Sequence, residues 1–329
     1  TLEELIAFLL RDLRAAAVTQ LGYIGGPVVI GRPVHFARNE GGDDDYAIGR
    51  LRSALEQSGF GPVVFEFEPV AAAYHYERRL ERDERVLIAD FGGGTSDFCL
   101  IQVGPEARRT RGTAQRILGT EGVAIAGDAF DSRLIRHVVA PHLGLGSSYR
   151  ALFTGELQAV PAWPYTQLRR WHRLSFLKSR DTLKLLNDIR NQAIEPEKID
   201  ALLHLVQNDL GYALYEAVER TKIELSSREQ SRFVFRDPPV NIDQIVRRAD
   251  FEQWIEPEVT AIAGCVDRLL EQTGIDPGSV DRVFMTGGSS FVPAVRRIFE
   301  QRFGADRLAS GDELTSVASG LALRAADLE

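Results

Sequence analysis

The stretch Ala89-Asp90-Phe91-Gly92-Gly93-Gly94-Thr95-Ser96-Asp97 decides the fold, because it joins two apolar runs, residues 85–91 and 96–103, through a glycine turn. Two strands joined by so short a turn form a hairpin and not a crossover. The stretch contains neither GxGxxG nor GxxxxGK[ST], and its glycines do not open a helix, which disfavours a Rossmann or Walker loop. Three glycines instead let backbone N–H groups approach an anion, which predicts binding of a polyphosphate.

Acidic side chains flank this glycine turn on both strands. Asp90 ends the first strand and Asp97 begins the second, so the hairpin brings two carboxylates to one turn. They could hold Mg²⁺ through water or position an attacking water, and Thr95 adds a hydroxyl beside the terminal phosphate. The alternative is a glycine hairpin with incidental aspartates, which the combination of two acids and a threonine disfavours.

Length and composition narrow the function classes. The chain has 329 residues, 44% of them hydrophobic, and a formal net charge of −8. It is long enough for two lobes, and its charge argues against nucleic-acid binding as the main role of the whole chain. Cys99 and Cys265 show no disulfide framework or metal-ligand spacing, and no apolar run has the length of a membrane span. We therefore expect a cytoplasmic protein without a nucleic-acid or membrane partner.

Hydrophobic periodicity predicts the order of helices and strands. Strands are expected over residues 27–36, 63–67, 85–91, 96–103 and 280–285, with a strand pair within 233–246. Helices are expected over residues 2–20, 46–57, 70–80, 127–139, 250–272, 293–303 and 313–325, and over 171–225 with a break near 195. Residues 104–112 are expected to form an exposed loop and 141–164 an irregular segment. The alternation predicts an α/β protein.

Two further patterns point to a nucleotide. Gly287-Gly288-Ser289-Ser290 follows an apolar strand and precedes a helix, which offers backbone amides to a phosphate or a nucleotide edge; an ordinary turn is the alternative. Glu219, Lys222, Ile223 and Ser226 recur on one helix face. Glu219 and Lys222 could bind ribose hydroxyls, and the alternative is a surface ion pair.

Together these segments resemble the ATPase domain of the heat-shock protein 70 (DnaK) family, within the actin/hexokinase/heat-shock ATPase superfamily. The Asp90 to Asp97 segment resembles the family's second phosphate loop. The other similar segments are residues 68–73 (connecting segment), 127–131 (Gly-Glu-Asp-Phe-Asp box), 219–227 (adenosine-binding helix), 284–293 (adenosine loop) and 311–322. Residues 31–34 and 194–198 are most similar to the YegD-like branch.

The resemblance implies a two-lobed actin-like ATPase fold with RNase H-like subdomains, and ATP or ADP with Mg²⁺ between the lobes. It assigns residues 1–81 to the remaining part of lobe I. Residues 82–126 and 276–329 are assigned to the RNase H-like core of lobe II, and 127–275 to a mostly helical insertion of that lobe.

The resemblance also implies roles for individual residues. Glu68, Asp90 and Asp97 would organise magnesium and its waters, and these three acids with Thr95 form the expected catalytic set. The residues expected to contact the nucleotide are Gly92, Gly93, Gly94, Thr95, Glu219, Lys222, Ile223, Ser226, Gly287, Gly288, Ser289, Phe291 and Asp312.

Three departures from the family pattern limit these expectations. The family's Asp-x-Gly-Thr phosphate loop and its γ-phosphate lysine have no counterpart here, and we expect both to precede Thr1 in the full protein. Without them hydrolysis would lose strong electrostatic groups. Ile223 and Phe291 occupy the positions of the two arginines that sandwich adenine, which changes base selectivity. The sequence ends at Leu328-Glu329, soon after the last similar segment, so we do not expect these residues to supply a peptide-binding domain.

The expected function is slow, Mg-dependent ATP hydrolysis that closes the lobes and changes the surface offered to a protein client or co-chaperone. Enzymatic activity depends on the presence of the missing phosphate loop. One alternative is a nucleotide-sensing scaffold that does not hydrolyse ATP. A less favoured alternative is a small-molecule kinase of the same superfamily. The oligomeric state stays open.

Overall fold

The computed structural model describes residues 1–22, 25–36, 44–110, 112–151, 154–309 and 315–328. The chain divides into two compact units. The first comprises residues 1–126, 260–290 and 295–329, and the second comprises 127–259 and 291–294. None of the helices in the described ranges is both long enough and apolar enough to cross a bilayer.

A five-stranded mixed sheet forms the centre of the first unit, in the order β11-β10-β3-β4-β5. β3 pairs antiparallel with β4 and parallel with β10, and β4 pairs antiparallel with β5. The sheet strands are β3 (Glu84–Phe91), β4 (Ser96–Val103), β5 (Ile117–Val123), β10 (Arg282–Thr286) and β11 (Leu308–Ala309). The hairpin predicted from the glycine turn is therefore confirmed.

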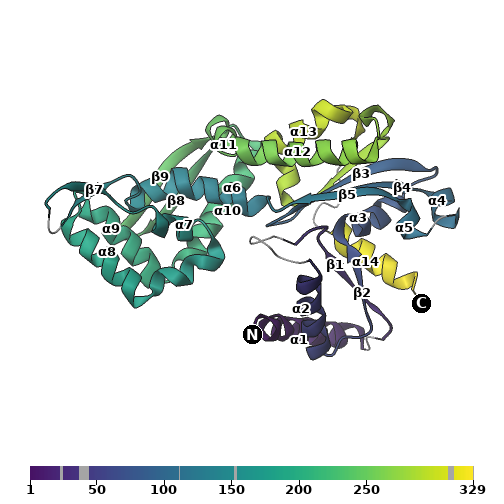
Figure 1. Cartoon of the computed structure of the whole chain (residues 1–329), viewed down its shortest axis with the longest axis horizontal. Helices are drawn as coiled ribbons and strands as arrows, with labels where there is room; N and C mark the ends of the chain where they lie inside the picture. Colours follow the sequence, from purple (N-terminus) through teal and green to yellow (C-terminus); the bar gives the residue numbers. More distant parts are fainter. Residues whose placement is uncertain (23–24, 37–43, 111, 152–153, 310–314, 329) are drawn as a thin grey trace. The chain divides into compact units, whose positions relative to one another are not determined.

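Both faces of this sheet are covered, because α3 and α14 lie on one side and α12 and α13 on the other (Figure 1). Successive residues of a strand point to opposite faces. Ile88 accordingly packs in the core cluster with Ala72 and Ala73 of α3, whereas Phe91 contacts Phe299 of α13 with ring centroids 6.0 Å apart. Burial on both faces explains why residues 86–89 of β3 are all apolar.

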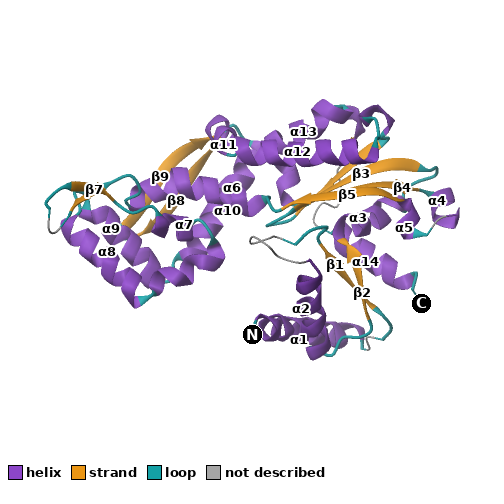
Figure 2. Cartoon of the chain, in the orientation of Figure 1, coloured by secondary structure: helices purple, strands orange, loops and turns teal. Residues whose placement is uncertain are grey.

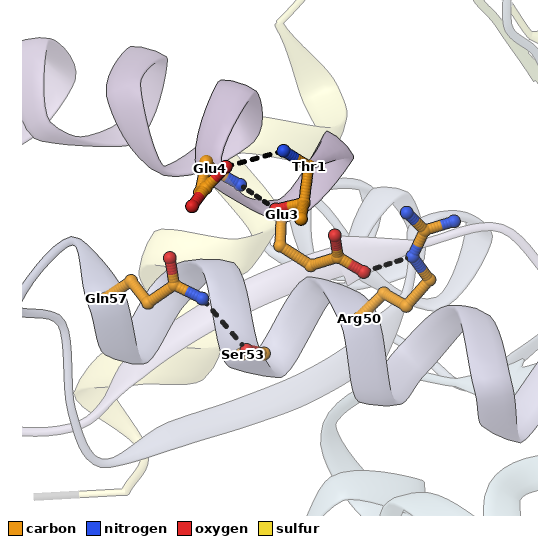
Figure 3. A network of polar contacts seen from close by, with 6 residues as sticks. All are labelled: Thr1, Glu3, Glu4, Arg50, Ser53 and Gln57. Atoms are coloured by element: carbon orange, nitrogen blue, oxygen red, sulfur yellow. Dashed lines mark hydrogen bonds and ion pairs between the residues drawn. The ribbon is translucent and has the colours of Figure 1, made fainter.

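The remaining elements of the first unit include a pair of helices and a parallel strand pair, β1 with β2. Glu3 of α1 pairs with Arg50 of α2, and Thr1 and Glu4 form a capping box at the start of α1 (Figure 3). These elements are α1 (Leu2–Leu21), β1 (Val28–Arg32), α2 (Asp44–Gln57), β2 (Val63–Phe67), α3 (Glu68–Glu77), α4 (Pro105–Thr110), α5 (Thr113–Arg116), η4 (Pro277–Ser279), η5 (Gly288–Phe291), η6 (Ala305–Arg307) and α14 (Ser316–Ala326). Three helices have residues in both units, namely η5, α12 (Glu256–Thr273) and α13 (Pro293–Phe303).

The second unit is mostly helical and also contains the antiparallel hairpin β8–β9 (Figure 2). Its helices are α6 (Gly127–Leu134), the π-helix η1 (Ile135–Val139), η2 (Ala140–Leu143), α7 (Trp163–Leu168), η3 (Trp171–Lys178), α8 (Arg180–Gln192), α9 (Pro196–Gln207), α10 (Gly211–Ser227) and α11 (Arg248–Trp254). Its strands are β6 (Ser148–Arg150), β7 (Leu157–Ala159), β8 (Gln230–Asp237) and β9 (Val240–Arg247). The predicted break near residue 195 is confirmed between α8 and α9.

Two local predictions were wrong, and strand β5 was not predicted. The expected loop 104–112 contains α4, because Pro105 and Glu106 suit the first turn of a helix. The expected helix 250–272 is two helices, α11 and α12, interrupted at Ile255. Pro257 lies in the first turn of α12, where its missing N–H removes no helical hydrogen bond. Strand β5 was not predicted, because Gly119 and Gly122 weaken its strand pattern.

Candidate functional site

The two aspartates of the glycine hairpin lie opposite each other, since Asp90 and Asp97 are register partners in β3 and β4. Both side chains are buried, with relative exposures of 8% and 1%. Burial, followed by the charges of Glu68 and Asp97, raises the pKa of Asp90 to about 7. Burial also raises the pKa of Asp97. The site therefore concentrates negative charge where water provides little screening.

Glu68 joins this pair from the first turn of α3, directly after strand β2. Burial and the charge of Asp97 raise its pKa. Asp97 is held in place by the backbone N–H of Val34, which donates to its Oδ1 at 2.7 Å, and by a hydrogen bond with the Thr95 side chain. The sequence analysis identified the three acids and Thr95 but missed Val34, because 63 residues separate it from Asp97.

The two glycine segments of the first unit lie at the same edge of the sheet. Parallel pairing aligns Asp90 with Thr286, so both loops follow the carboxyl ends of neighbouring strands. Gly287 has φ +82°, and a Cβ there would overlap the carbonyl oxygen of Phe91. Only glycine permits this close approach. Residues 92–94 are exposed, so the backbone of the hairpin turn is accessible to a ligand.

Four predicted adenosine residues of the second unit lie on α10, and Phe291 lies at the end of η5. Lys222 pairs with Asp131 at 2.8 Å, and Ser226 donates to the carbonyl oxygen of Lys222. Glu219 is exposed on the same helix. Ile223 and Phe291 are 62% and 51% exposed, so both offer apolar surface to a ligand.

The Lys222–Asp131 pair provides a test of local stability. Asp131 is 8% exposed, burial raises its pKa, and the charge of Lys222 opposes that shift. Lys222→Met leaves this carboxylate without its counter-ion, so we expect the free energy of unfolding at pH 8 to fall by about 2 to 3 kcal/mol. The loss should shrink as the pH falls and Asp131 takes up a proton.

Urea unfolding at pH 8 and pH 5 measures this effect. Lys198→Met is the matched control, because Lys198 forms a more exposed pair with Glu195 within one helical turn. We expect that control to cost less than about 1 kcal/mol. Equal losses of unfolding free energy in the two variants would show that the Lys222–Asp131 pair contributes no more to stability than the exposed Lys198–Glu195 pair.

The predicted site residues are divided between the two units. Glu68, Asp90, Thr95, Asp97 and the glycines of both loops belong to the first unit, whereas Glu219, Lys222, Ile223, Ser226 and Phe291 belong to the second. Ser289 is buried, and Asp312 lies outside the described residues. Across the described ranges, no group of three or more His, Cys, Asp or Glu side chains is arranged to hold a metal directly.

The chain is similar to known proteins along most of its length. Residues 184–329 match the family model described as Hsp70 protein. The chain is 27% identical over 335 residues to the chaperone protein DnaK of Thermus thermophilus, with 99% of this chain and 43% of that protein covered. It is 24% identical over 340 residues to the chaperone protein DnaK of Thermotoga petrophila, with 100% and 45% covered. The chain thus spans less than half the length of these relatives.

Proposed function

We propose that the chain is a member of the Hsp70 family with its α/β actin-like ATPase fold, and that it binds ATP or ADP with Mg²⁺ and hydrolyses ATP slowly. The single observation that supports this proposal best is the cluster of Glu68, Asp90 and Asp97 beside the exposed glycine turn. Buried carboxylates with raised pKa values are typical of sites where a cation or a reacting group relieves their repulsion.

The residues present fit a magnesium ion bound through its waters. Carboxylate oxygens are the ligands that Mg²⁺ prefers, and the ion usually keeps several waters instead of an all-protein cage. When bound, it would neutralise phosphate charge. Asp90 would orient water from one strand, and Asp97, fixed by Val34, would do so from the other. The exposed amides of residues 92–94 would contact the phosphates.

We propose that the nucleoside is recognised by α10 and by Phe291. Glu219 and Lys222 would bind the ribose, and Ile223 and Phe291 would contact the base through apolar surface. Base contacts with aromatic side chains are worth about 1 to 3 kcal/mol. Since these contacts are not specific for one base, we expect selectivity for adenine to be weaker than with hydrogen-bonding side chains.

Two finer assignments are part of the same proposal. Lobe boundaries at residues 81, 126 and 275 and membership of the YegD-like branch remain predictions from the resemblance.

Closure of the lobes on ATP would change the surface available to a client or co-chaperone. A nucleotide-sensing scaffold without hydrolysis is the second candidate, and the departures at Ile223 and Phe291 favour it.

Calorimetry and phosphate release on the full-length protein test the proposal. We expect ATP and ADP to bind, and ATP to release phosphate slowly with Mg²⁺ but not with a chelator. Nucleotide binding without phosphate release would favour the scaffold. Strong stimulation of ATP consumption by one sugar or polyol would favour a kinase, and the lack of any nucleotide binding would refute the proposal.

A further inference from the structure

Positive charge is concentrated in one part of the second unit. Residues 132–180 contain eight arginine and lysine side chains and a single acidic one, Glu156, although the whole chain has a net charge of −8. The expectation of no nucleic-acid partner came from the whole-chain charge, which conceals this local excess. A basic stretch of this kind is typical of a surface that binds a polyanion.

The fold gathers several of these arginines around α6 and η3. The hydroxyl of Tyr215 on α10 donates to the carbonyl oxygen of Leu168 at 3.1 Å, and the indole N–H of Trp171 donates to Asp128 of α6 at 3.4 Å. These contacts fix Arg169 and Arg170, which lie between the two anchored residues. The contact with Asp128 places this segment beside α6, which carries Arg133, and Arg136 follows in η1. Partial burial and the charges of Arg136 and Arg133 also lower the pKa of Arg169.

Most of this arginine cluster lacks internal counter-ions. Arg133 pairs with Glu258 at 2.8 Å. Within the part of the chain that the structure describes, Arg136, Arg169 and Arg170 have no acidic partner. Arginines that serve only to stabilise a fold are normally arranged beside carboxylates, as Arg190 is beside Asp200. Cations gathered without such partners repel one another, and a bound anion would relieve that repulsion.

An exposed aromatic ring accompanies the cluster. Trp171 is 59% exposed, yet its ring is held by the hydrogen bond to Asp128 and by an edge contact with His172 at 5.6 Å. An exposed ring with a fixed orientation is a platform on which a nucleobase can stack, whereas a carboxylate gains little from it. The combination therefore favours a nucleic acid over an acidic peptide.

We propose that this surface, defined by Arg136, Arg169, Arg170 and Trp171, binds single-stranded nucleic acid. The guanidinium groups would donate to backbone phosphates, and the indole would stack on a base. This activity is separate from the proposed nucleotide hydrolysis and does not depend on it.

Fluorescence anisotropy of a labelled oligothymidine of about 16 nucleotides tests the proposal with the full-length protein. The double variant Arg169→Ala/Arg170→Ala should weaken binding at least about tenfold. It should also reduce, by about 2, the slope of the logarithm of the binding constant against the logarithm of the salt concentration. Trp171→Ala should weaken it about 5- to 150-fold, and Trp171→Phe should retain most of the affinity.

The matched control is Arg190→Ala/Arg232→Ala, because these exposed arginines of the same unit are paired with Asp200 and Asp243. This control should bind the oligonucleotide with an affinity within about twofold of the wild-type value. Circular dichroism checks that each variant is folded. Lack of oligonucleotide binding by the wild-type protein at low salt would overturn the proposal. Equal affinity for a polyglutamate peptide, with no effect of Trp171→Ala, would also overturn it in favour of an acidic peptide.

Discussion

Replacing Asp90 by Asn is expected to slow Mg-dependent ATP hydrolysis at least about 100-fold, the usual effect of removing one electrostatic group from a phosphate or oxyanion site. Asn keeps the shape of the side chain but cannot carry the charge that Mg²⁺ and its waters require. Steady-state phosphate release by the full-length protein measures the effect. Asp12→Asn, at an exposed position of α1, is the control and should leave the rate unchanged.

The same variant should be more stable than the wild type when metal and nucleotide are removed. The pKa of Asp90 is 3.8 unfolded and about 7 folded, so its contribution to stability is fully present below about 3.8 and is lost as the pH rises through 7. At pH 8 the ionised carboxylate costs the folded state on the order of 2 to 4 kcal/mol, which Asn avoids. Urea unfolding in chelator should therefore show a gain for Asp90→Asn at pH 8 and almost none at pH 4.

These two measurements separate a catalytic site from a structural one. If Asp90 had only a structural role, its conversion to Asn would destabilise the protein, and activity would fall only as far as the folded fraction falls. Unchanged phosphate release in Asp90→Asn would contradict the magnesium assignment. Unchanged stability at pH 8 would show that burial and the charges of Glu68 and Asp97 do not raise the pKa of Asp90 in solution.

Local signals in the sequence predicted the parts of the fold that depend on neighbouring residues. Strands β2 and β4 and helix α13 have the predicted bounds, because each combines a clear apolar pattern with Gly or Pro at its ends. Strand β5 was missed because its partner β4, and not its own composition, holds it in the sheet. Tertiary pairing of this kind is not visible in a single sequence.

In the candidate site, too, local features could be predicted from the sequence and features that depend on distant contacts could not. The hairpin motif identified Asp90 and Asp97 because its strands place them opposite each other. The support from Val34 depends on contact across 63 residues, which no local pattern encodes. The basic cluster was not predicted because the net charge of the whole chain is negative. The relevant quantity is the local number of basic and acidic side chains around α6 and η3.

Helix packing beside the site leads to the second large expected effect. Gly320 of α14 is buried against α3, and a Cβ there would overlap the backbone carbonyl of Ala71. A backbone atom in the middle of a helix cannot rotate aside, so Gly320→Ala must push the two helices apart. We expect the free energy of unfolding to fall by about 3 kcal/mol or more, which urea denaturation measures.

A displaced α14 should also weaken the site, because α3 begins at Glu68 and packs along α14. Gly49→Ala is the control, since Gly49 lies within α2 with no atom within 4 Å of its would-be Cβ. That substitution should stabilise the protein by about 0.5 to 1 kcal/mol through helix propensity. If Gly320→Ala were equally stabilising, the close packing of α14 on α3 would be wrong, and with it the placement of Glu68 beside Asp90 and Asp97.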